Sequence, residues 1–574
     1  MMPVHNSDIS RVFEQIADFL EIKGDNPFRI RAYREGARTI ENLVENAADM
    51  VSEGEDLTEL PGIGEDLADK IEVIVAEGTH PLLEELKEEL PEGLLDILNI
   101  ESLGPKRVQK IYNELGVENL QQLERAARSG KIKDLEGFGE KTTQKIIKQL
   151  QKDRSAADRH LFGKVQEVAE AVKDYLVRKS VVDKVEIAGS YRRKKETVGD
   201  LDVLVISDSP EETSDYFVDF EDVEDVIAHG ETKSSVVLRG EIQVDLRVVA
   251  EKSYGAALHY FTGSKEHNIA LRKLAQQEDL KVNEYGVFKG DEQVAGASEE
   301  EIYSLFDCQF IEPELRENRG EIEAARNGKL PDLIELEDLR GDLQCHTTAS
   351  DGANTLQEMG EAARQLGHEY LAVTDHSAHL GVTGGLDEKR VCEQMEKIDE
   401  INRSWDDFRL LKSIEVDILA DGQLDLADEI LAELDIVTAA IHTKFDLPPT
   451  EQTERIVSAL QNPHVNVLAH PTGRKLLDRE GYQFDLDKVI ETAAGQNCCL
   501  EINSSPQRLD LDDRMAARAR EKGVKITIST DAHNTQNLNY LKYGVYQARR
   551  AWLEADDVLN TWKWNKIKKY LFGR

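Results

Sequence analysis

The chain has 574 residues, of which 40% are hydrophobic and 32% are charged, and its formal net charge is −41. A chain of this length exceeds what one hydrophobic core supports, so we expect about three to five domains. No run approaches the ~18 consecutive apolar residues of a membrane span, and residues 1–9 lack the pattern of a secretory leader. The composition therefore predicts a cytoplasmic protein that does not associate with membranes.

The cysteine pattern and the net charge limit the class of protein further. The five cysteines follow no regular spacing and form no C-x-x-C pair, which favours reduced thiols over a disulfide framework. A net charge of −41 argues against non-specific attraction to nucleic acid, because phosphate neutralisation usually needs a basic surface. Lysine and arginine nevertheless cluster at 131–152 and 192–195. Any contact with DNA must therefore be local.

Three glycine-containing turns recur in the first 150 residues. They are Leu60-Pro-Gly-Ile-Gly64, Ser102-Leu-Gly-Pro-Lys106 and Gly137-Phe-Gly-Glu-Lys141, and an apolar run with helical periodicity follows each of them. Glycine tolerates a positive φ and lets a phosphate approach the backbone, where the free N–H groups of the next helix favour an anion. One such turn is more often a connection between packed helices, but three in series favour DNA binding.

These turns resemble the helix-hairpin-helix element, which contacts the DNA backbone without regard to base sequence. The resemblance implies phosphate contacts at Gly62, Gly64, Gly104, Gly137 and Gly139. The second turn has Ser102 where the element has its first glycine, so we expect this turn to bind the DNA backbone more weakly.

Short β-rich runs begin near residue 184 and carry acidic side chains. Residues two apart in a strand share a face, so Asp200 and Asp202 present their carboxylates to one side, and Asp245 can join them from a neighbouring strand. Three converging carboxylates suit two Mg²⁺ or Mn²⁺ ions that also hold substrate phosphates. An isolated D-x-D is more often a surface strand. Here G-S-x-R-R at 189–193 precedes G-D-x-D at 199–202, and this spacing favours a nucleotidyltransferase.

Residues 1–316 resemble the family X DNA polymerases of the DNA polymerase β type. The resemblance rests on these motifs, on Tyr260-Phe-Thr-Gly-Ser264 and on Lys281-Val-Asn-Glu-Tyr285. It implies template-directed synthesis from deoxynucleoside triphosphates, with the metals held by Asp200, Asp202 and Asp245. Asp245 would also help to deprotonate the primer 3′-hydroxyl. The residues that the resemblance implies for nucleotide binding are Gly189, Ser190, Arg193, Gly199, Tyr260, Phe261, Gly263, Asn268 and Arg272.

The N-terminal domain of that family can also cleave 5′-deoxyribose phosphate through a Schiff-base lysine. The matching position is Lys70. Such a lysine must lose its proton, which burial or neighbouring cations assist, whereas the nearby Asp66 and Asp69 do the opposite. We therefore favour a solvated helix lysine at this position and keep lyase activity as the alternative.

Beyond residue 339, short β-branched runs ending in histidine or an acid alternate with helical patterns. This alternation predicts a parallel sheet long enough to close into a distorted β/α barrel, whose function lies at the carboxyl ends of its strands. A lone histidine there is usually structural, but a series with mixed carboxylates suits Mn²⁺, Zn²⁺ or Fe²⁺. The series comprises His346, Asp351, His376, Glu415, His442, His470, Asp531 and His533.

This last segment resembles a polymerase-and-histidinol-phosphatase (PHP) domain. The resemblance implies that the series holds up to three divalent ions. The first motif of that family reads H-x-H, whereas this chain has Gln344-Cys-His346, and an amide oxygen is a weaker ligand than imidazole. We therefore expect one metal site to be partly filled.

The predicted architecture is multidomain, with helical N-terminal domains, an α+β palm and thumb, and an α/β C-terminal domain. Its parts are a helical lyase-like domain with the first hairpin at 1–85, a fingers-like helical domain with the further hairpins at 86–155, a palm at 156–255, a thumb at 256–316, a charged linker at 317–338 and the PHP domain at 339–574.

The functional hypothesis is a DNA repair polymerase that fills gaps and carries a second, metal-dependent site. That second site would process DNA 3′ ends as a 3′–5′ exonuclease or phosphoesterase, with cleavage at abasic sites as a further activity. One alternative is a gap-binding polymerase whose C-terminal domain is only a scaffold, and another is a C-terminal small-molecule phosphatase. The expected partners are gapped or nicked DNA and deoxynucleoside triphosphates, and we expect a monomer.

Overall fold

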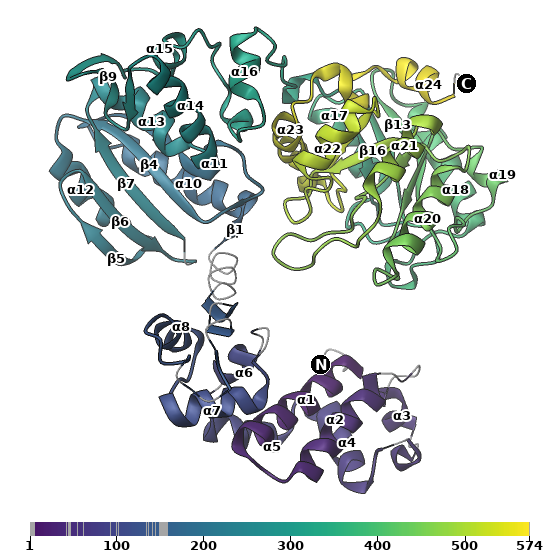
Figure 1. Ribbon diagram of the computed structural model, residues 1–574. Coiled ribbons are helices and arrows are strands. Elements are labelled where there is room, and N and C mark those ends of the chain that lie inside the picture. The colour runs from purple at the N-terminus through teal and green to yellow at the C-terminus, as the bar shows by residue number, and fades with distance from the viewer. Residues whose placement is uncertain are drawn as a thin grey trace. The chain divides into compact units, whose positions relative to one another are not determined.

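The computed structural model describes residues 6–41, 43, 47–53, 56–60, 62–91, 93–98, 100, 103–133, 135, 137–139, 142–143, 145–147, 159–240 and 242–572. These residues form two compact units, Met1–Ala157 and Asp158–Arg574 (Figure 1).

The first unit is helical and contains two hydrophobic clusters. Its helices are α1 (Asn6–Lys23), α2 (Pro27–Glu41), α3 (Ala47–Glu53), α4 (Glu65–Glu77), α5 (Pro81–Glu89), α6 (Gly93–Leu98), α7 (Pro105–Leu115) and α8 (Leu120–Arg128). Phe13 and Ile71 belong to the first cluster, and Ile97 and Ile111 belong to the second. Leu90 packs against both clusters, so the unit consists of two helical halves joined near this residue.

The second unit begins with a five-stranded sheet in the order β2-β4-β7-β6-β5. Strands β4 and β7 are parallel, and the other neighbours are antiparallel. The elements are β1 (His160–Leu161), α10 (Phe162–Val177), β2 (Val182–Ile187), α11 (Gly189–Arg192), β3 (Thr197–Val198), β4 (Asp200–Ser207), α12 (Pro210–Val218), β5 (Val223–His229), β6 (Lys233–Leu238) and β7 (Gln243–Val249).

The two faces of this sheet are covered by different helices. Val203 of β4 belongs to the core that includes residues of α10 and α12, whereas Leu204 packs with α13 (Tyr254–Thr262). Side chains alternate between the faces of a strand, so Asp200 and Asp202 share the face of Leu204. The predicted metal ligands therefore lie on the face that carries α13.

A smaller helix-and-sheet region follows the palm. Its further elements are α14 (Lys265–Gln277), β8 (Lys281–Asn283), β9 (Gly286–Lys289), β10 (Glu292–Ala295), α15 (Glu299–Ser304) and α16 (Glu321–Arg326). Leu271 and Tyr303 lie in its core. Residues 317–338, expected as a charged linker or connecting helix, contain α16, and Ile334 within them is buried in the C-terminal core.

The C-terminal region is a seven-stranded sheet whose strands follow one another in chain order from β11 to β17. All neighbouring pairs are parallel, and a further bridge from Cys345 to Ala532 nearly closes the sheet. The strands are β11 (Gly341–Cys345), β12 (Tyr370–Val373), β13 (Arg409–Asp417), β14 (Ile436–Ala440), β15 (Val467–Leu468), β16 (Cys499–Asn503) and β17 (Ile526–Ser529). The predicted distorted β/α barrel is confirmed.

Helices surround this barrel (Figure 1). They are α17 (Leu356–Gln365), α18 (Glu388–Asn402), α19 (Asp428–Leu431), α20 (Pro449–Leu460), α21 (Leu486–Gln496), α22 (Asp513–Glu521), α23 (Leu541–Arg550) and α24 (Trp564–Phe572). Ile567 and Leu571 of α24 pack against residues that begin strands, such as Tyr370 and Ile436. The amino ends of the strands are thus covered, and the carboxyl ends remain for a site.

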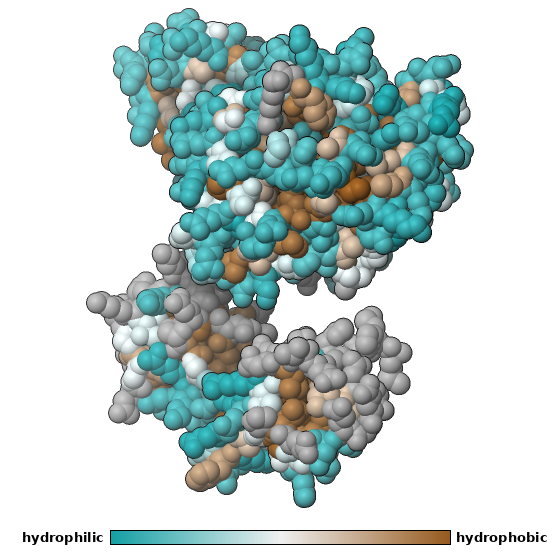
Figure 2. Space-filling view, turned by 90° about the vertical axis from the view of Figure 1, so that its right-hand side faces the viewer, coloured by the Kyte–Doolittle hydropathy of each residue, from teal (hydrophilic) through white to brown (hydrophobic). Residues whose placement is uncertain are grey.

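Hydrophilic residues cover most of the face shown in Figure 2, in line with the charge of −41. Among the described residues, no helix is long and apolar enough to cross a membrane.

Candidate active sites

The helical unit presents its glycine turns with open backbone. Gly64 is the N-cap residue of α4, and Gly104 is the N-cap residue of α7. Because glycine has no side chain, no side-chain cap hydrogen bond forms at either helix start. A Cβ built at Gly64, Gly104, Gly137 or Gly139 would meet no atom within 4 Å, so nothing in the described chain crowds these turns. Gly62 has a φ of +79° and Gly137 a φ of +88°, which a side chain rarely adopts. The turns therefore leave room for a phosphate at a helix start, whereas Ser102 lies outside the described residues.

Lys70 lies in α4, four residues after Asp66. Its ammonium donates to the Asp66 carboxylate at 2.5 Å and to the Asp66 carbonyl at 3.1 Å. Schiff-base formation requires a free amine, whereas the Lys70 nitrogen is engaged by Asp66. The contact anticipated from the sequence is thus present, and lyase activity at Lys70 stays a prediction.

The three palm aspartates come together on adjacent parallel strands. Asp202 of β4 is the direct partner of Asp245 of β7, and Asp200 lies two residues before Asp202. Burial, followed by the charges of Asp200 and Asp245, raises the pKa of Asp202 to about 7. Burial and the charge of Asp245 also raise the pKa of Asp200. Such mutual repulsion is what a bound divalent cation relieves, so the donor set fits Mg²⁺ or Mn²⁺.

Helix α11 runs beside these aspartates. Gly189 opens the helix with a φ of +64°, and a Cβ there would lie 2.8 Å from Asp202 Oδ2, so only glycine fits. Ser190 follows it. Gly199 lies between β3 and β4, directly before Asp200. The glycines thus let α11 and the carboxylates approach closely.

The two arginines of the motif have different partners. Arg192 makes a bidentate ion pair with Glu299 and donates to the Thr262 hydroxyl at 2.8 Å. Arg193 contacts Glu317 at 3.1 Å and also donates to the Thr262 carbonyl. Its guanidinium lies 3.2 Å from the position that a Cβ on Gly263 would occupy. Arg193 therefore lies beside Gly263 of the predicted nucleotide segment, whereas the Arg192 guanidinium is held by its ion pair with Glu299.

The remaining predicted nucleotide residues lie on or after α13. Tyr260 and Phe261 are half-buried and contact each other edge to face, and the Arg247 guanidinium lies over the Phe261 ring at 4.2 Å. Asn268 donates to the Tyr260 carbonyl at 2.7 Å, and the exposed Arg272 donates to the Asn268 carbonyl at 3.2 Å. Phe261 packs on the sheet face that carries the aspartates.

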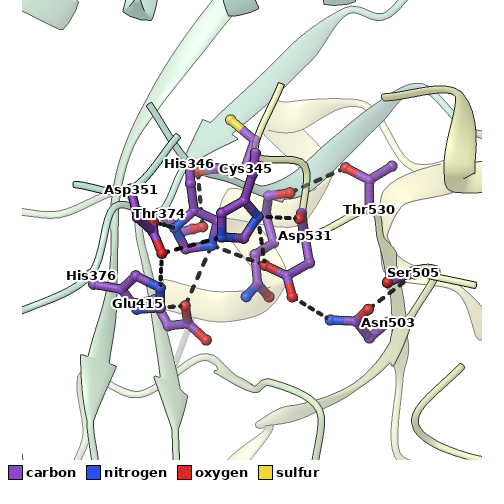
Figure 3. Close-up of polar contacts among 12 residues, drawn as sticks. Cys345, His346, Asp351, Thr374, His376, Glu415, Asn503, Ser505, Thr530 and Asp531 are labelled. Atoms are coloured by element: carbon purple, nitrogen blue, oxygen red, sulfur yellow. Dashed lines mark hydrogen bonds and ion pairs between the residues drawn. The ribbon is translucent and has the colours of Figure 1, made fainter. Parts of the chain in front are cut away.

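The PHP residues converge at the carboxyl ends of the barrel strands (Figure 3). Ligand atoms gather in three groups, namely His346, Asp351, His376 and His533, then His376, Glu415 and His442, and then His346, Glu415 and Asp531. His470 joins them through Nε2, which lies 3.0 Å from Glu415 Oε1. All eight predicted ligands therefore belong to one cluster.

Glu415 lies at the centre of this cluster. Its carboxylate contacts His376 at 3.1 Å, His470 at 3.0 Å and His442 at 3.5 Å. Burial opposes the charged carboxylate, but the neighbouring His376 and His442 hold the pKa of Glu415 well below its usual range. A buried carboxylate surrounded by imidazoles can bridge two cations.

Several buried atoms of the cluster make no directed hydrogen bond. They include both ring nitrogens of His346, Nδ1 of His376 and of His470, and Oε2 of Glu415. His346 Nε2 and His376 Nδ1 lie 3.0 and 3.1 Å from the carboxylates of Asp531 and Glu415. Buried polar atoms without a hydrogen bond are costly, and a divalent ion bound by imidazole and carboxylate would satisfy them. The residues present therefore fit metal ions.

The buried side chain of Gln344 also lacks hydrogen-bond partners, as the metal-site atoms above do. It is 1% exposed, and neither its amide nitrogen nor its amide oxygen has a hydrogen-bond partner. Either a metal ion or a water would satisfy this amide.

The backbone is strained at two of the predicted ligands. His470 has a φ of +29° and Asp531 a φ of +55°, values that side-chain-bearing residues rarely adopt. A strained backbone conformation persists only where packing and hydrogen bonds around it hold it in place, and such conformations are concentrated at functional sites.

Sequence reasoning assigned no role to several residues that hold the cluster in place. Asp417 accepts a hydrogen bond from His442 Nδ1 at 2.8 Å and thereby orients that imidazole. The Asn503 amide donates to Asp531 at 3.1 Å, and Glu501 accepts from the His470 backbone N–H at 2.7 Å. Alternation at strand ends, as in Glu415-x-Asp417, was a usable signal for these acids. Arg508, whose Nε lies 3.7 Å from Asp531 Oδ2, had none.

Five segments of the chain match known families. The matches are a helix-hairpin-helix domain at 4–80, a SAM-like helix-hairpin-helix tandem at 94–152, a DNA polymerase beta palm at 163–259, a DNA polymerase beta thumb at 257–317 and a PHP domain at 342–505. Fold and sites together define a DNA polymerase β-like nucleotidyltransferase joined to a PHP domain.

The whole chain also has a close relative. This chain is 40% identical over 572 residues to the DNA polymerase/3′-5′ exonuclease PolX of Bacillus subtilis (strain 168), and the aligned region covers 99% of each chain. The protein therefore belongs to the PolX family, and the resemblance drawn from the motifs is confirmed.

Shorter relatives match the C-terminal region alone. A probable phosphatase of Thermoanaerobacter sp. (strain X514) is 32% identical over 247 residues, which is 40% of this chain and 93% of the relative. A probable phosphatase of Acetivibrio thermocellus is 31% identical over 201 residues, which is 33% of this chain and 78% of the relative.

Proposed function

We propose that the palm catalyses DNA synthesis at gaps, with a divalent-metal requirement. The observation that carries this proposal is the convergence of Asp200, Asp202 and Asp245 on the face that carries α13. When bound, Mg²⁺ or Mn²⁺ would stabilise the charge that develops on the transferring phosphate. Asp245 would accept the proton of the primer 3′-hydroxyl. Arg193 would orient the triphosphate beside Gly263.

Primer extension on gapped DNA tests this proposal. Asp245→Ala should lower extension by orders of magnitude while gap binding persists, because the helical unit and the other phosphate contacts remain. Asp208→Ala is the matched control, since Asp208 is an exposed aspartate directly after the same sheet's β4. Near-normal extension by the Asp245 variant would refute the assignment.

We propose further that the PHP cluster hydrolyses phosphoester bonds at DNA 3′ ends. Support comes from the eight converging predicted ligands, from their buried atoms that make no hydrogen bond and from the exonuclease named in the Bacillus subtilis relative. Up to three ions would bind, and Mn²⁺, Zn²⁺ or Fe²⁺ suits the imidazole-rich set better than Mg²⁺. The ions would act as Lewis acids and activate water. Glu415 would hold them together, and Asp417 would fix the His442 ring.

Trimming of a labelled 3′ end distinguishes this proposal from its alternatives. His470→Ala should abolish trimming and leave primer extension intact, because the palm uses separate ligands. His464→Ala is the control, since His464 precedes β15 at the covered end of the barrel. If the chain retains no metal and trims no end, the domain is a scaffold. If it cleaves small phosphomonoesters but no DNA end, it is a small-molecule phosphatase, which the shorter relatives keep as the second candidate.

The partners that we propose are gapped or nicked DNA and deoxynucleoside triphosphates. A monomeric state and a cytoplasmic location stay predictions. Sedimentation of the full chain with and without gapped DNA would test the first.

A further inference from the structure

A cavity of about 530 Å³ adjoins the PHP cluster, and residues of the palm line part of it. Asp531 and His533 of the cluster form one side. Lys164 and Glu167, both on the palm helix α10, lie on another. The cavity therefore lies between two regions that are far apart in the sequence but belong to the same compact unit.

Close packing holds α10 against the PHP domain. Phe162 contacts Tyr543 and Tyr546 edge to face, with ring centroids 6.1 and 5.7 Å apart. A Cβ on Gly163 would lie 3.0 Å from Pro506, so glycine permits this approach. Because Tyr543 is buried in the palm core, the wall formed by α10 is a fixed part of the cavity.

The lining has the chemistry of a nucleotide site. Lys164, Lys475 and Arg508 provide positive charge, and Tyr540 and Tyr543 provide aromatic surface. Aromatic rings stack on bases, and lysine contacts phosphate as a point charge. The volume falls within the range of small-ligand pockets and would accept one nucleotide unit. In a chain with a net charge of −41, a local cluster of cations is what draws a phosphate to this place.

We propose that this cavity binds the terminal nucleotide of the strand that the PHP site hydrolyses, and that Lys164 of the palm contacts its phosphate backbone. This inference rests on the hydrolase function proposed above. The palm helix α10 is then part of the substrate site of the second enzyme. Glu167, one helical turn from Lys164, faces the same cavity and repels the phosphate.

The test compares variants of exposed residues on one helix. Lys164 and Glu167 are both exposed, so their replacement leaves the packing intact. Lys164→Ala should raise the KM for a single-stranded oligonucleotide about three- to ten-fold and lower the salt slope of binding by about one, as expected for one lost phosphate contact. Lys164→Arg should restore most of the affinity. Glu167→Gln should act in the opposite direction and lower the KM about two-fold.

Lys173→Ala is the matched control, because Lys173 lies on the same helix and pairs with Glu186 at 3.4 Å. A KM for Lys164→Ala equal to that of Lys173→Ala would overturn the proposal. So would an equal loss on bis(p-nitrophenyl) phosphate, a diester that has only the scissile phosphate and no backbone phosphate for Lys164 to contact, because a subsite residue should favour the oligonucleotide. The wild-type chain with Mn²⁺ separates the two proposals: no hydrolysis of either substrate refutes the hydrolase itself, whereas normal hydrolysis without a Lys164 effect refutes only the subsite.

Discussion

The metal-free palm should gain stability when Asp202 loses its charge. Burial and the charges of Asp200 and Asp245 raise the pKa of Asp202 from 3.8 to about 7. A shift of this size corresponds to about 4 kcal/mol of destabilisation when the carboxylate is ionised. Asp202→Asn removes the charge and keeps the shape. We expect the variant to be about 2–4 kcal/mol more stable than the wild type at pH 8, although it should not extend primers.

The sign of the pH dependence follows from the raised pKa. A group whose pKa is higher in the folded chain contributes stability that is complete below its unfolded value of 3.8 and is lost as the pH rises through about 7. The wild type therefore recovers stability on acidification, and the variant does not. The advantage of Asp202→Asn should shrink by about 1–3 kcal/mol, more than half of its value, between pH 8 and pH 5.

Hydrogen exchange of the β4 and β7 amides in EDTA measures this quantity, because a chain with several units does not unfold in one step. Asp208→Asn, at the exposed end of the same strand, should change neither the exchange nor its pH dependence. An Asp202→Asn advantage that is absent, or that does not vary with pH, would show that neither burial nor the charges of Asp200 and Asp245 disfavour the Asp202 carboxylate in the metal-free site.

Further predictions concern the other sites. Gly64→Val should weaken gap binding without unfolding the helical unit, because Gly64 has a φ of −96° and open space at its Cβ, and binding isotherms check this; affinity equal to the wild type would mean that the first turn is only a connection. Gln344→His should strengthen metal retention, measured by elemental analysis after dialysis, because imidazole is the better ligand for an otherwise unpaired buried position; unchanged metal content would show that this position holds no ion. Glu299→Gln should destabilise the thumb by about 3–5 kcal/mol, seen in its hydrogen exchange, because the fully buried Arg316 loses its carboxylate partner. Removal of divalent ions by EDTA should stop both primer extension and end trimming, and Mn²⁺ should restore trimming better than Mg²⁺; preference for Mg²⁺ in trimming would contradict the imidazole-rich assignment.

The sequence by itself determined which residues form both sets of predicted ligands. Period-two alternation placed Asp200 and Asp202 on one face, and the β-branched runs ending in histidine or acid marked the strand ends of a barrel. In both cases, local geometry fixes the direction of a side chain relative to its own strand, so a pattern in the sequence carries the information. The glycine turns were visible for the same reason, since a positive φ is a local property of residues such as Gly62.

Only the tertiary structure decided which neighbours these residues have. Arg192 and Arg193 are adjacent in sequence, yet one pairs with Glu299 and the other with Glu317. The register of β4 against β7 makes Asp202 and Asp245 direct partners, and the packing of α10 brings Lys164 to a cavity beside Asp531. Contacts between residues that are far apart in the chain depend on how whole elements pack, and no local pattern encodes them.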